Sequence, residues 1–356
     1  MGFQSSEKFC SLFPDVRFPI IQAPMAGTAT PELAAAVSNA GGLGSIGIGS
    51  SNPASAREMI LATQALTDLP FNVNVFCHQP PQRDSKVEQD WITHLGPLFE
   101  EFDAEPPIEL TENNKSFLAD DDVLEILLET KPPVVSFHFG LPHPHQLAAL
   151  KNAGITTLAT ATDLADARLI ESAGVDAIVA QGIEAGGHRG VFSLDETDEK
   201  LPTSVLVRLL VSQLDIPVIA SGGIMDGKGI RAMLDIGAVA AQMGTAFVLC
   251  PESAANTGYR DALKSEKSAA TRLTRTISGR PARGLNNRLI EYCESPESPK
   301  PPAYPVTYDA GKQLIAAAAG HGNFEIAAHW AGQGAPLARE MPAADLVETL
   351  MSELEG

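Results

Sequence analysis

The sequence predicts an α/β protein that folds as a (β/α)8 TIM barrel with a smaller inserted cap or substrate domain. Apolar, β-branched runs alternate along the chain with Ala- and Leu-rich segments of helical spacing, and Gly ends many of those segments. Eight such units follow one another over about 230 residues, which is the size of a closed barrel. A doubly wound sheet would alternate in the same way, but it fits eight units less well.

The candidate strands are apolar on both faces and are separated by helical segments such as PELAAAVSNAGG and DLADARLIESAG. This alternation predicts a parallel sheet inside a shell of helices. The strands are expected at residues 18–25, 43–48, 71–76, 134–140, 156–162, 176–182, 217–224 and 238–245.

Two regions interrupt the alternation. Residues 77–130 are too long for an ordinary loop between a strand and a helix, so we expect an insertion over one end of the barrel. Residues 251–309 contain a helical part and the Pro-rich connector SPESPKPPAYP, which predicts a small cap or substrate domain. The expected division is therefore a barrel over 1–250, a cap over 251–309, and a helical segment over 310–356 that packs back on the barrel.

Composition narrows the function classes. The chain has 25 Lys and Arg against 44 Asp and Glu, a net charge of −19, which disfavours nucleic acid and anionic membranes as partners. Its four cysteines form no CxxC pair, and no cluster of metal-ligand spacing occurs at the strand ends, so we expect no metal site. No signal peptide or membrane-spanning run is visible, which favours a cytoplasmic protein; the sequence leaves the oligomeric state open.

The ends of the seventh and eighth strands carry the strongest functional signal. In barrels of this class the loops after these strands bind phosphate. Gly222 and Gly223 would let backbone N–H groups approach phosphate oxygens, and Thr245 would add a hydroxyl. Tight turns without a ligand are the alternative, but two such loops together favour a cofactor that carries a phosphate.

Polar side chains are expected at the ends of other strands. Gln22, Asn72 and Gln181 offer neutral amides, which suit a planar ring with several donors and acceptors, such as a flavin. After the sixth strand, Gly186 and Gly187 lead into His188, an imidazole that can take a proton or hold an anion near neutral pH.

Two further side chains are weaker candidates for the substrate pocket. His138 is expected either to line the pocket or to pack within the barrel. Arg189 could help to hold an anion, although an arginine in such a loop more often forms a structural ion pair.

Taken in order, the segments PIIQAPMAG, FNVNVF, QGIEAGGHRG, IPVIASGGI and AAQMGTAF, followed by SGRPARG and WAGQG, resemble the nitronate monooxygenases, once called 2-nitropropane dioxygenases, of the FMN-dependent barrel class. The resemblance implies that His188 is the catalytic residue. It also implies an FMN site made of Ala23, Pro24, Met25, Asn72, Gln181, Gly186, Gly222, Gln242, Met243, Gly244 and Thr245.

The implied activity is the oxidation of alkyl nitronates by O2 to a carbonyl compound and nitrite. FMN-dependent enoyl-acyl-carrier-protein reductases share the barrel, the Gly-Gly-His turn and the phosphate loops, so a reductase that uses NAD(P)H is the alternative. An acidic chain is a less natural partner for an acidic carrier protein. A barrel that binds its ligand without turnover is a third possibility, which the His188 loop and the strand-end amides disfavour.

Overall fold

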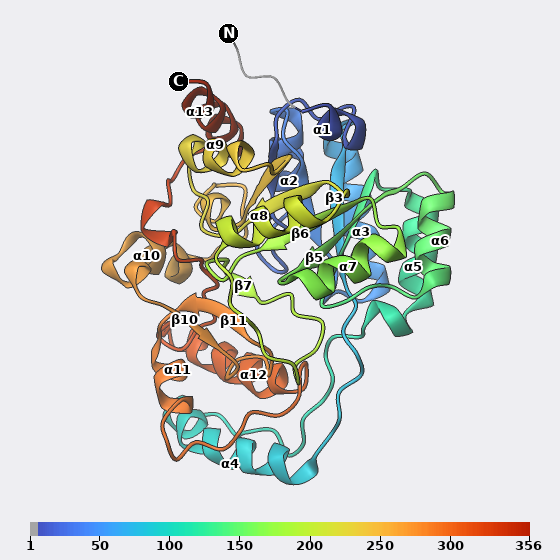
Figure 1. The fold of residues 1–356 in the computed structure, drawn as a ribbon. Helices are drawn as coiled ribbons and strands as arrows, with labels where there is room; N and C mark the ends of the chain where they lie inside the picture. Colours follow the sequence, from blue (N-terminus) through green and yellow to red (C-terminus); the bar gives the residue numbers. More distant parts are fainter. Residues whose placement is uncertain (1–5) are drawn as a thin grey trace.

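The computed structural model describes residues 6–356 and confirms the predicted barrel (Figure 1). All eight predicted strands are present, each within its expected range, and all pair in parallel in the order β1-β9-β8-β6-β5-β4-β3-β2. A bridge between Ile21 and Leu43 joins the first and last strands of this order and closes the barrel. The strands are β1 Ile20–Gln22, β2 Gly44–Gly47, β3 Phe71–Phe76, β4 Val134–His138, β5 Thr156–Ala161, β6 Ala177–Gln181, β8 Val218–Ser221 and β9 Ala240–Met243.

Helices surround the barrel as predicted, and most begin at residues that favour a helix start. Thr30, Asn52, Asp163 and Asp226 accept hydrogen bonds from backbone N–H groups in the first turns of their helices. The helices that follow the first seven barrel strands are α2 Pro31–Asn39, α3 Pro53–Leu66, α5 Asp121–Thr130, α6 Pro144–Asn152, α7 Leu164–Ala173, α8 Thr203–Gln213 and α9 Gly227–Asp235.

The eighth barrel helix is supplied by the C-terminal end of the chain. Helix α13 (Ala343–Glu355) packs against α9 and α2 and fills the gap between them. Gly227 makes this close approach possible, because a Cβ there would lie 2.4 Å from the backbone nitrogen of Leu354. The backbone N–H of Gly227 also donates to Glu353 Oε2 at 2.9 Å.

The amino-terminal end of the barrel is closed by α1 (Glu7–Leu12) and the residues after it. Phe9 and Phe13 are buried and form one apolar cluster with Ile21, Leu158 and Ile219 from the barrel strands. This plug leaves the carboxyl end of the barrel as the end where a ligand can enter.

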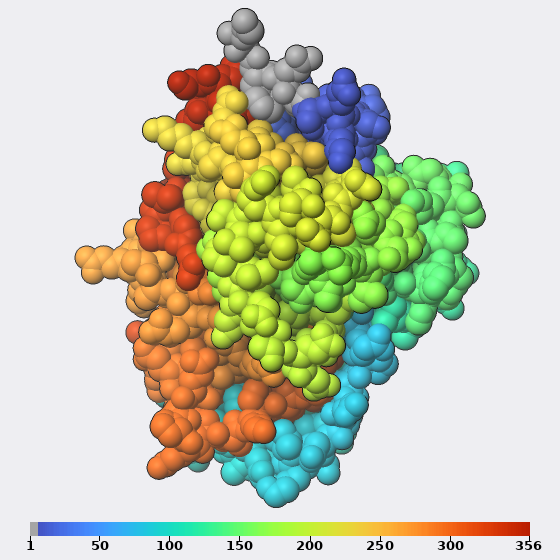
Figure 2. Space-filling view, in the orientation of Figure 1, coloured from blue at the N-terminus to red at the C-terminus, as the bar shows by residue number. Residues whose placement is uncertain are grey.

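A second apolar core lies beyond that carboxyl end. It contains α4 (Ser85–Glu101), α11 (Arg288–Cys293) and α12 (Thr307–Gly320), which come from two distant parts of the chain. Figure 2 shows these parts, coloured cyan and orange, side by side below the barrel. We call residues 77–116 and 271–330 together the cap.

A three-stranded antiparallel sheet links the cap to the barrel. Its strands are β10 (Thr271–Thr274), β11 (Ala282–Leu285) and the two-residue strand β7 (Gly187–His188), in the order β10-β11-β7. Since β7 belongs to the loop after β6, the sheet places that barrel loop against the cap. The remaining short elements are α10 Thr257–Lys264 and the 3-10 turns η1 Phe117–Ala119, η2 Thr245–Phe247, η3 Glu266–Ala269 and η4 Ala335–Leu337.

The packing differs from the expected domain ranges at two points. Helix α5 lies within the range 77–130 expected for the insertion, but its apolar face belongs to the barrel core. Helix α12 lies mostly in the range 310–356 expected to pack on the barrel, but it packs against α4 in the cap. The division into domains otherwise stays a prediction. Among the described residues, no helix has both the length and the apolar character that a membrane span requires.

Candidate active site

A cavity of about 370 Å³ lies between the carboxyl end of the barrel and the cap. Barrel loops form one wall, and Tyr304, Tyr308, Lys312 and Trp330 of the cap form part of the other. Fourteen of the seventeen residues expected at the site line this cavity. They are Ala23, Pro24, Met25, His138, Gln181, Gly186, Gly187, His188, Gly222, Gly223, Gln242, Met243, Gly244 and Thr245.

Gln22 and Asn72 do not line the cavity, although both were expected to meet a cofactor. Both are fully buried inside the barrel. Gln22 Oε1 accepts the backbone N–H of Ser45 at 2.8 Å, and Asn72 Nδ2 donates to Ser45 Oγ at 3.2 Å. Asn74 shares the face of Asn72 because side chains two residues apart on a strand point the same way. Since Asn74 is closer to the carboxyl end, it lines the cavity instead.

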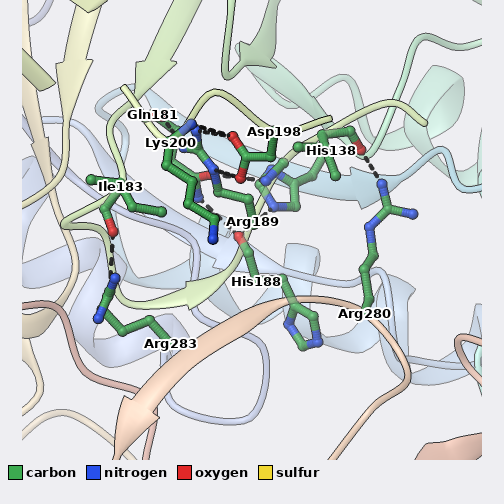
Figure 3. A network of polar contacts seen from close by, with 11 residues as sticks. His138, Gln181, Ile183, His188, Arg189, Asp198, Lys200, Arg280 and Arg283 are labelled. Atoms are coloured by element: carbon green, nitrogen blue, oxygen red, sulfur yellow. Dashed lines mark hydrogen bonds and ion pairs between the residues drawn. The ribbon is translucent and has the colours of Figure 1, made fainter. Parts of the chain in front are cut away.

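Arg189 is also absent from the cavity wall. Its guanidinium forms two hydrogen bonds of 2.9 Å with the carboxylate of Asp198 and a third with the backbone oxygen of Gln181 (Figure 3). Only 3% of Arg189 is exposed. The expectation that it contacts substrate is therefore wrong in this structure, and its role is the structural ion pair that was the alternative.

The loops after β8 and β9 have the geometry that a phosphate site needs. Gly222 and Gly223 have φ angles of +127° and +71°, which side chains other than glycine rarely adopt. The turn η2 begins at Thr245, and the first N–H groups of a helical turn have no partner within it. Thr245 Oγ1 accepts the backbone N–H of Gly332 at 3.0 Å, so this hydroxyl also ties the barrel loop to the segment WAGQG.

Glycines explain how the WAGQG segment reaches the cavity. A Cβ on Gly332 would lie 2.7 Å from the backbone oxygen of Glu184, and one on Gly186 would lie 2.5 Å from the nitrogen of Gly332. Both contacts are closer than a Cβ can tolerate, so the loop after β6 and the WAGQG segment pack backbone against backbone. The sequence pointed to this motif without assigning it a role.

His188 stands where the two walls meet. Its ring lies among Phe139, Tyr304, Tyr308 and Trp330, with ring centroids 5.3–5.8 Å away. Burial, and then repulsion from His138 once that ring is protonated at low pH and from Arg280, lowers the pKa of His188 to about 3. The imidazole is therefore neutral near pH 7.

A hydrogen bond to Ser278 determines which nitrogen of His188 carries the proton. Ser278 Oγ donates to the backbone oxygen of Arg280 at 3.0 Å, so toward His188 it acts as an acceptor. Since His188 Nε2 lies 2.9 Å from this oxygen, Nε2 carries the proton and donates. Nδ1 is then the unprotonated nitrogen, which is able to accept a proton.

A buried cation stands beside this histidine. Only 4% of Arg280 is exposed, and its guanidinium lies 4.2 Å from the centroid of the Phe139 ring. Burial lowers the pKa of Arg280 to about 10, so the group stays charged at neutral pH. Its Nη2 donates to the backbone oxygen of Val191, while Nε has no partner within the protein. A positive charge here favours an anionic ligand nearby.

Several cap residues of the site were missed at the sequence level, namely Asn114, Ser278, Arg280, Tyr304, Tyr308, Lys312 and Trp330. Ser278 and Arg280 belong to SGRPARG, and Trp330 begins WAGQG, so the motifs were visible but their side chains had no assigned place. Tyr304 follows the Pro-rich connector and carries no local signal of function.

The comparisons with known proteins agree with this geometry. A family model described as nitronate monooxygenase matches residues 8–353. A nitronate monooxygenase from Paraburkholderia phytofirmans is 57% identical over 337 residues, which cover 95% of this chain and 92% of the relative.

Two solved structures are similar over nearly the whole chain. The nitroalkane oxidase from Streptomyces ansochromogenes has a TM-score of 0.88 and 40% identity, with 98% of each chain covered. FabK from Thermotoga maritima has a TM-score of 0.75 and 30% identity, with 99% of this chain and 96% of that chain covered. From the family model and the curated relative together, the chain belongs to the nitronate monooxygenase family.

Proposed function

We propose that this enzyme uses FMN to oxidise alkyl nitronates with O2, giving a carbonyl compound and nitrite. One observation carries the proposal: a single cavity joins a glycine-rich cradle at the strand ends to a neutral histidine and to Lys312, and the buried Arg280 lies outside the cavity wall but close enough to act on that histidine. The cradle suits a phosphate-bearing cofactor, and the charge of Arg280 suits an anionic substrate such as a nitronate.

The residues present fit FMN in shape and chemistry. The backbone at Gly222, Gly223 and Thr245 would hold the phosphate, and the loop from Ala23 to Met25 would border the ring. The cavity volume lies in the range of small-molecule sites. When bound, FMN would supply the electron acceptor and the reactivity toward O2 that the side chains lack.

The side chains of the protein would bind and orient the substrate and exclude water from the cavity. The positive charge of Arg280, which is buried outside the cavity wall, would favour an anion in the cavity. The rings of Tyr304, Tyr308 and Trp330 close the cavity on the cap side. His188 Nδ1 would accept a proton from carbon when the substrate is a neutral nitroalkane. With a pKa of about 3 His188 is a weak base, so a preformed nitronate, which needs no proton removed, is the favoured substrate.

An NAD(P)H-dependent reductase of enoyl thioesters is the second candidate, and the likeness to FabK is compatible with it as far as the fold reaches. The net charge of −19 counts against docking of an acidic carrier protein. The higher identity to a nitronate monooxygenase supports the first candidate.

Anaerobic mixing of the FMN-loaded protein with an alkyl nitronate, NADH and NADPH in turn separates the two candidates. We expect the nitronate to change the flavin absorbance rapidly and either nicotinamide to bleach it only slowly. Rapid bleaching by a nicotinamide without a response to the nitronate would replace the proposal by the reductase.

The cofactor has its own test. Acid precipitation of the purified yellow protein is expected to release FMN, identified by its mass. A colourless protein that does not bind added FMN, or one that releases FAD, would contradict the cofactor assignment.

A further inference from the structure

We propose that His138 is a positioning residue, which acts with Gln181 to hold the backbone oxygen of His188 and thereby fixes the place of its imidazole. The inference rests on the proposed function, in which His188 meets the substrate. It assigns to His138 a role that acts through another residue, although its ring borders the cavity.

Two side chains from separate barrel strands converge on one carbonyl group. His138 Nε2, at the end of β4, lies 3.1 Å from the backbone oxygen of His188, and Gln181 Nε2, at the end of β6, donates to the same oxygen at 2.9 Å (Figure 3). Gln181 Oε1 in turn accepts the backbone N–H of Gly190 at 2.8 Å. The two strands therefore hold the loop on both sides of Arg189.

The partners of His138 leave it neither a free base nor a free acid. A carbonyl oxygen only accepts, so Nε2 must carry the proton. Nδ1 then accepts from the hydroxyl of Thr160, whose Oγ1 lies 3.0 Å away. Burial lowers the pKa of His138 to about 4, which agrees with a neutral ring in this tautomer. With both nitrogens bonded to the protein, His138 cannot exchange a proton with substrate unless one of these bonds breaks.

The segment that carries His188 needs such support. Strand β7 has two residues, and Gly187 within it has a φ of +73°. Its partner β11 belongs to the cap, so the ladder between them does not tie His188 to the barrel. The hydrogen bonds from His138 and Gln181 supply that tie. Displacing a reacting group by about 1 Å can lower a rate by about 10²-fold.

Paired substitutions test the hydrogen bond itself. An asparagine side chain places its amide near the position of Nδ1, whereas glutamine reaches the position of Nε2. His138→Asn should therefore lose the bond to His188 and lower kcat for an alkyl nitronate by about 10- to 100-fold, with KM and FMN content changed less. His138→Gln should restore most of that loss, and the exposed His145→Asn serves as the matched control. Equal kcat in the Asn and Gln variants would overturn the proposal.

Nitrogen NMR of the histidine rings gives a readout that does not depend on turnover. We expect the signal that disappears in His138→Gln to be a neutral ring protonated at Nε2 from pH 6 to 8. A ring protonated at Nδ1, or one that titrates in this range, would contradict the hydrogen bond.

His188→Asn, measured in parallel, separates the role of His188 in the proposed function from the positioning role of His138. Parental activity in His188→Asn would refute the role of His188 in the proposed function, and the tautomer of His138 would still decide the hydrogen bond. Impaired His188→Asn together with fully active His138→Asn would refute only the positioning role.

Discussion

The two walls of the cavity are built in different ways. The barrel wall consists largely of backbone and glycine at strand ends, so most of its residues lie within a few positions of a barrel strand, with Tyr259, Gly332 and Gly334 as exceptions. The cap wall consists of side chains from residue 114, the segment 304–312 and residue 330, and Ser278 of the cap contacts His188 from outside the wall. The cofactor half of the site is thus local in sequence, whereas the substrate half is assembled only by folding.

The largest expected effect concerns the residue at which the walls meet. His188→Asn removes the nitrogen that accepts a proton and keeps a polar side chain. Oxidation of a neutral nitroalkane should fall by about 10² to 10⁴, because it needs a proton removed from carbon. Oxidation of the preformed nitronate should fall less. Steady-state rates with the two substrates measure the difference, and parental rates with both would make His188 only a turn residue.

The barrel wall is tested by Thr245→Val, which removes the hydroxyl that accepts the N–H of Gly332. Leaving that buried N–H without a partner costs about 1 to 3 kcal/mol, so FMN affinity and thermal stability should both decline. Thr245→Ser keeps the hydroxyl and is the matched control. Titration of the apoprotein with FMN, followed by fluorescence, measures the affinity.

A substitution at Gly223 tests the same wall without touching that hydrogen bond. Gly223→Val should weaken FMN binding, because its φ of +71° strains any other residue and a Cβ there would lie 3.1 Å from the Cβ of Glu184, so the loop must shift. The barrel should remain folded. If neither Gly223→Val nor Thr245→Val changes FMN affinity, the phosphate lies elsewhere.

The difference between the two walls explains which parts of the fold and of the site could be predicted from the sequence. All eight strands follow from short apolar runs that repeat along the chain, and the glycines at 222 and 223 stand directly after one of them. Strand alternation alone could not tell Asn72 from Asn74, because both point inward and only their depth in the barrel separates them. Arg189 was ambiguous because its partner Asp198 sits in a loop without regular spacing.

Local sequence patterns could not predict which segments pack together to form the cap. Its core joins α4 to α11 and α12, which lie nearly two hundred positions further along the chain, and no periodicity links such distant helices. For the same reason Tyr304 and Tyr308 gave no sign that they face His188. A helical segment over 310–356 was expected to pack on the barrel, and α13 does so, but its place as the eighth barrel helix was not predicted, since the cap separates α13 from the strand that it completes.

The loss of folding stability at low pH tests the burial of His78, which packs against Tyr304 of the cap wall. This ring is 1% exposed and contacts Tyr304, with centroids 4.9 Å apart. Burial, and then the charge of Arg280, lowers the pKa of His78 to about 4. The folded state therefore disfavours the proton that the unfolded chain takes up near pH 6.5, so stability is present above that pH and is lost as the pH falls from about 6.5 toward 4.

Between pH 7 and pH 5 we expect His78 to account for about 1 to 2 kcal/mol of lost stability. Urea unfolding at the two pH values measures the loss. His78→Leu should reduce the difference by that amount, and the exposed His143→Leu should not. An unchanged difference in His78→Leu would show that the ring is already protonated or solvated in the folded protein.

The smallest expected effect comes from Trp330→Leu, a substitution that changes the cap wall and leaves the cofactor cradle intact. The indole of Trp330 lines the cavity with its centroid 5.3 Å from that of His188, while its backbone oxygen is held by the hydroxyl of Tyr259. Trp330→Leu keeps the backbone contact but removes part of the aromatic wall, so KM for the nitronate should rise a few-fold as about 1 kcal/mol of binding is lost. FMN affinity should stay near that of the parent, because the cradle at Gly222, Gly223 and Thr245 is unchanged. A variant with lowered FMN affinity and unchanged KM would mean that Trp330 belongs to the cofactor half, and the division between a local cofactor wall and an assembled substrate wall would not hold.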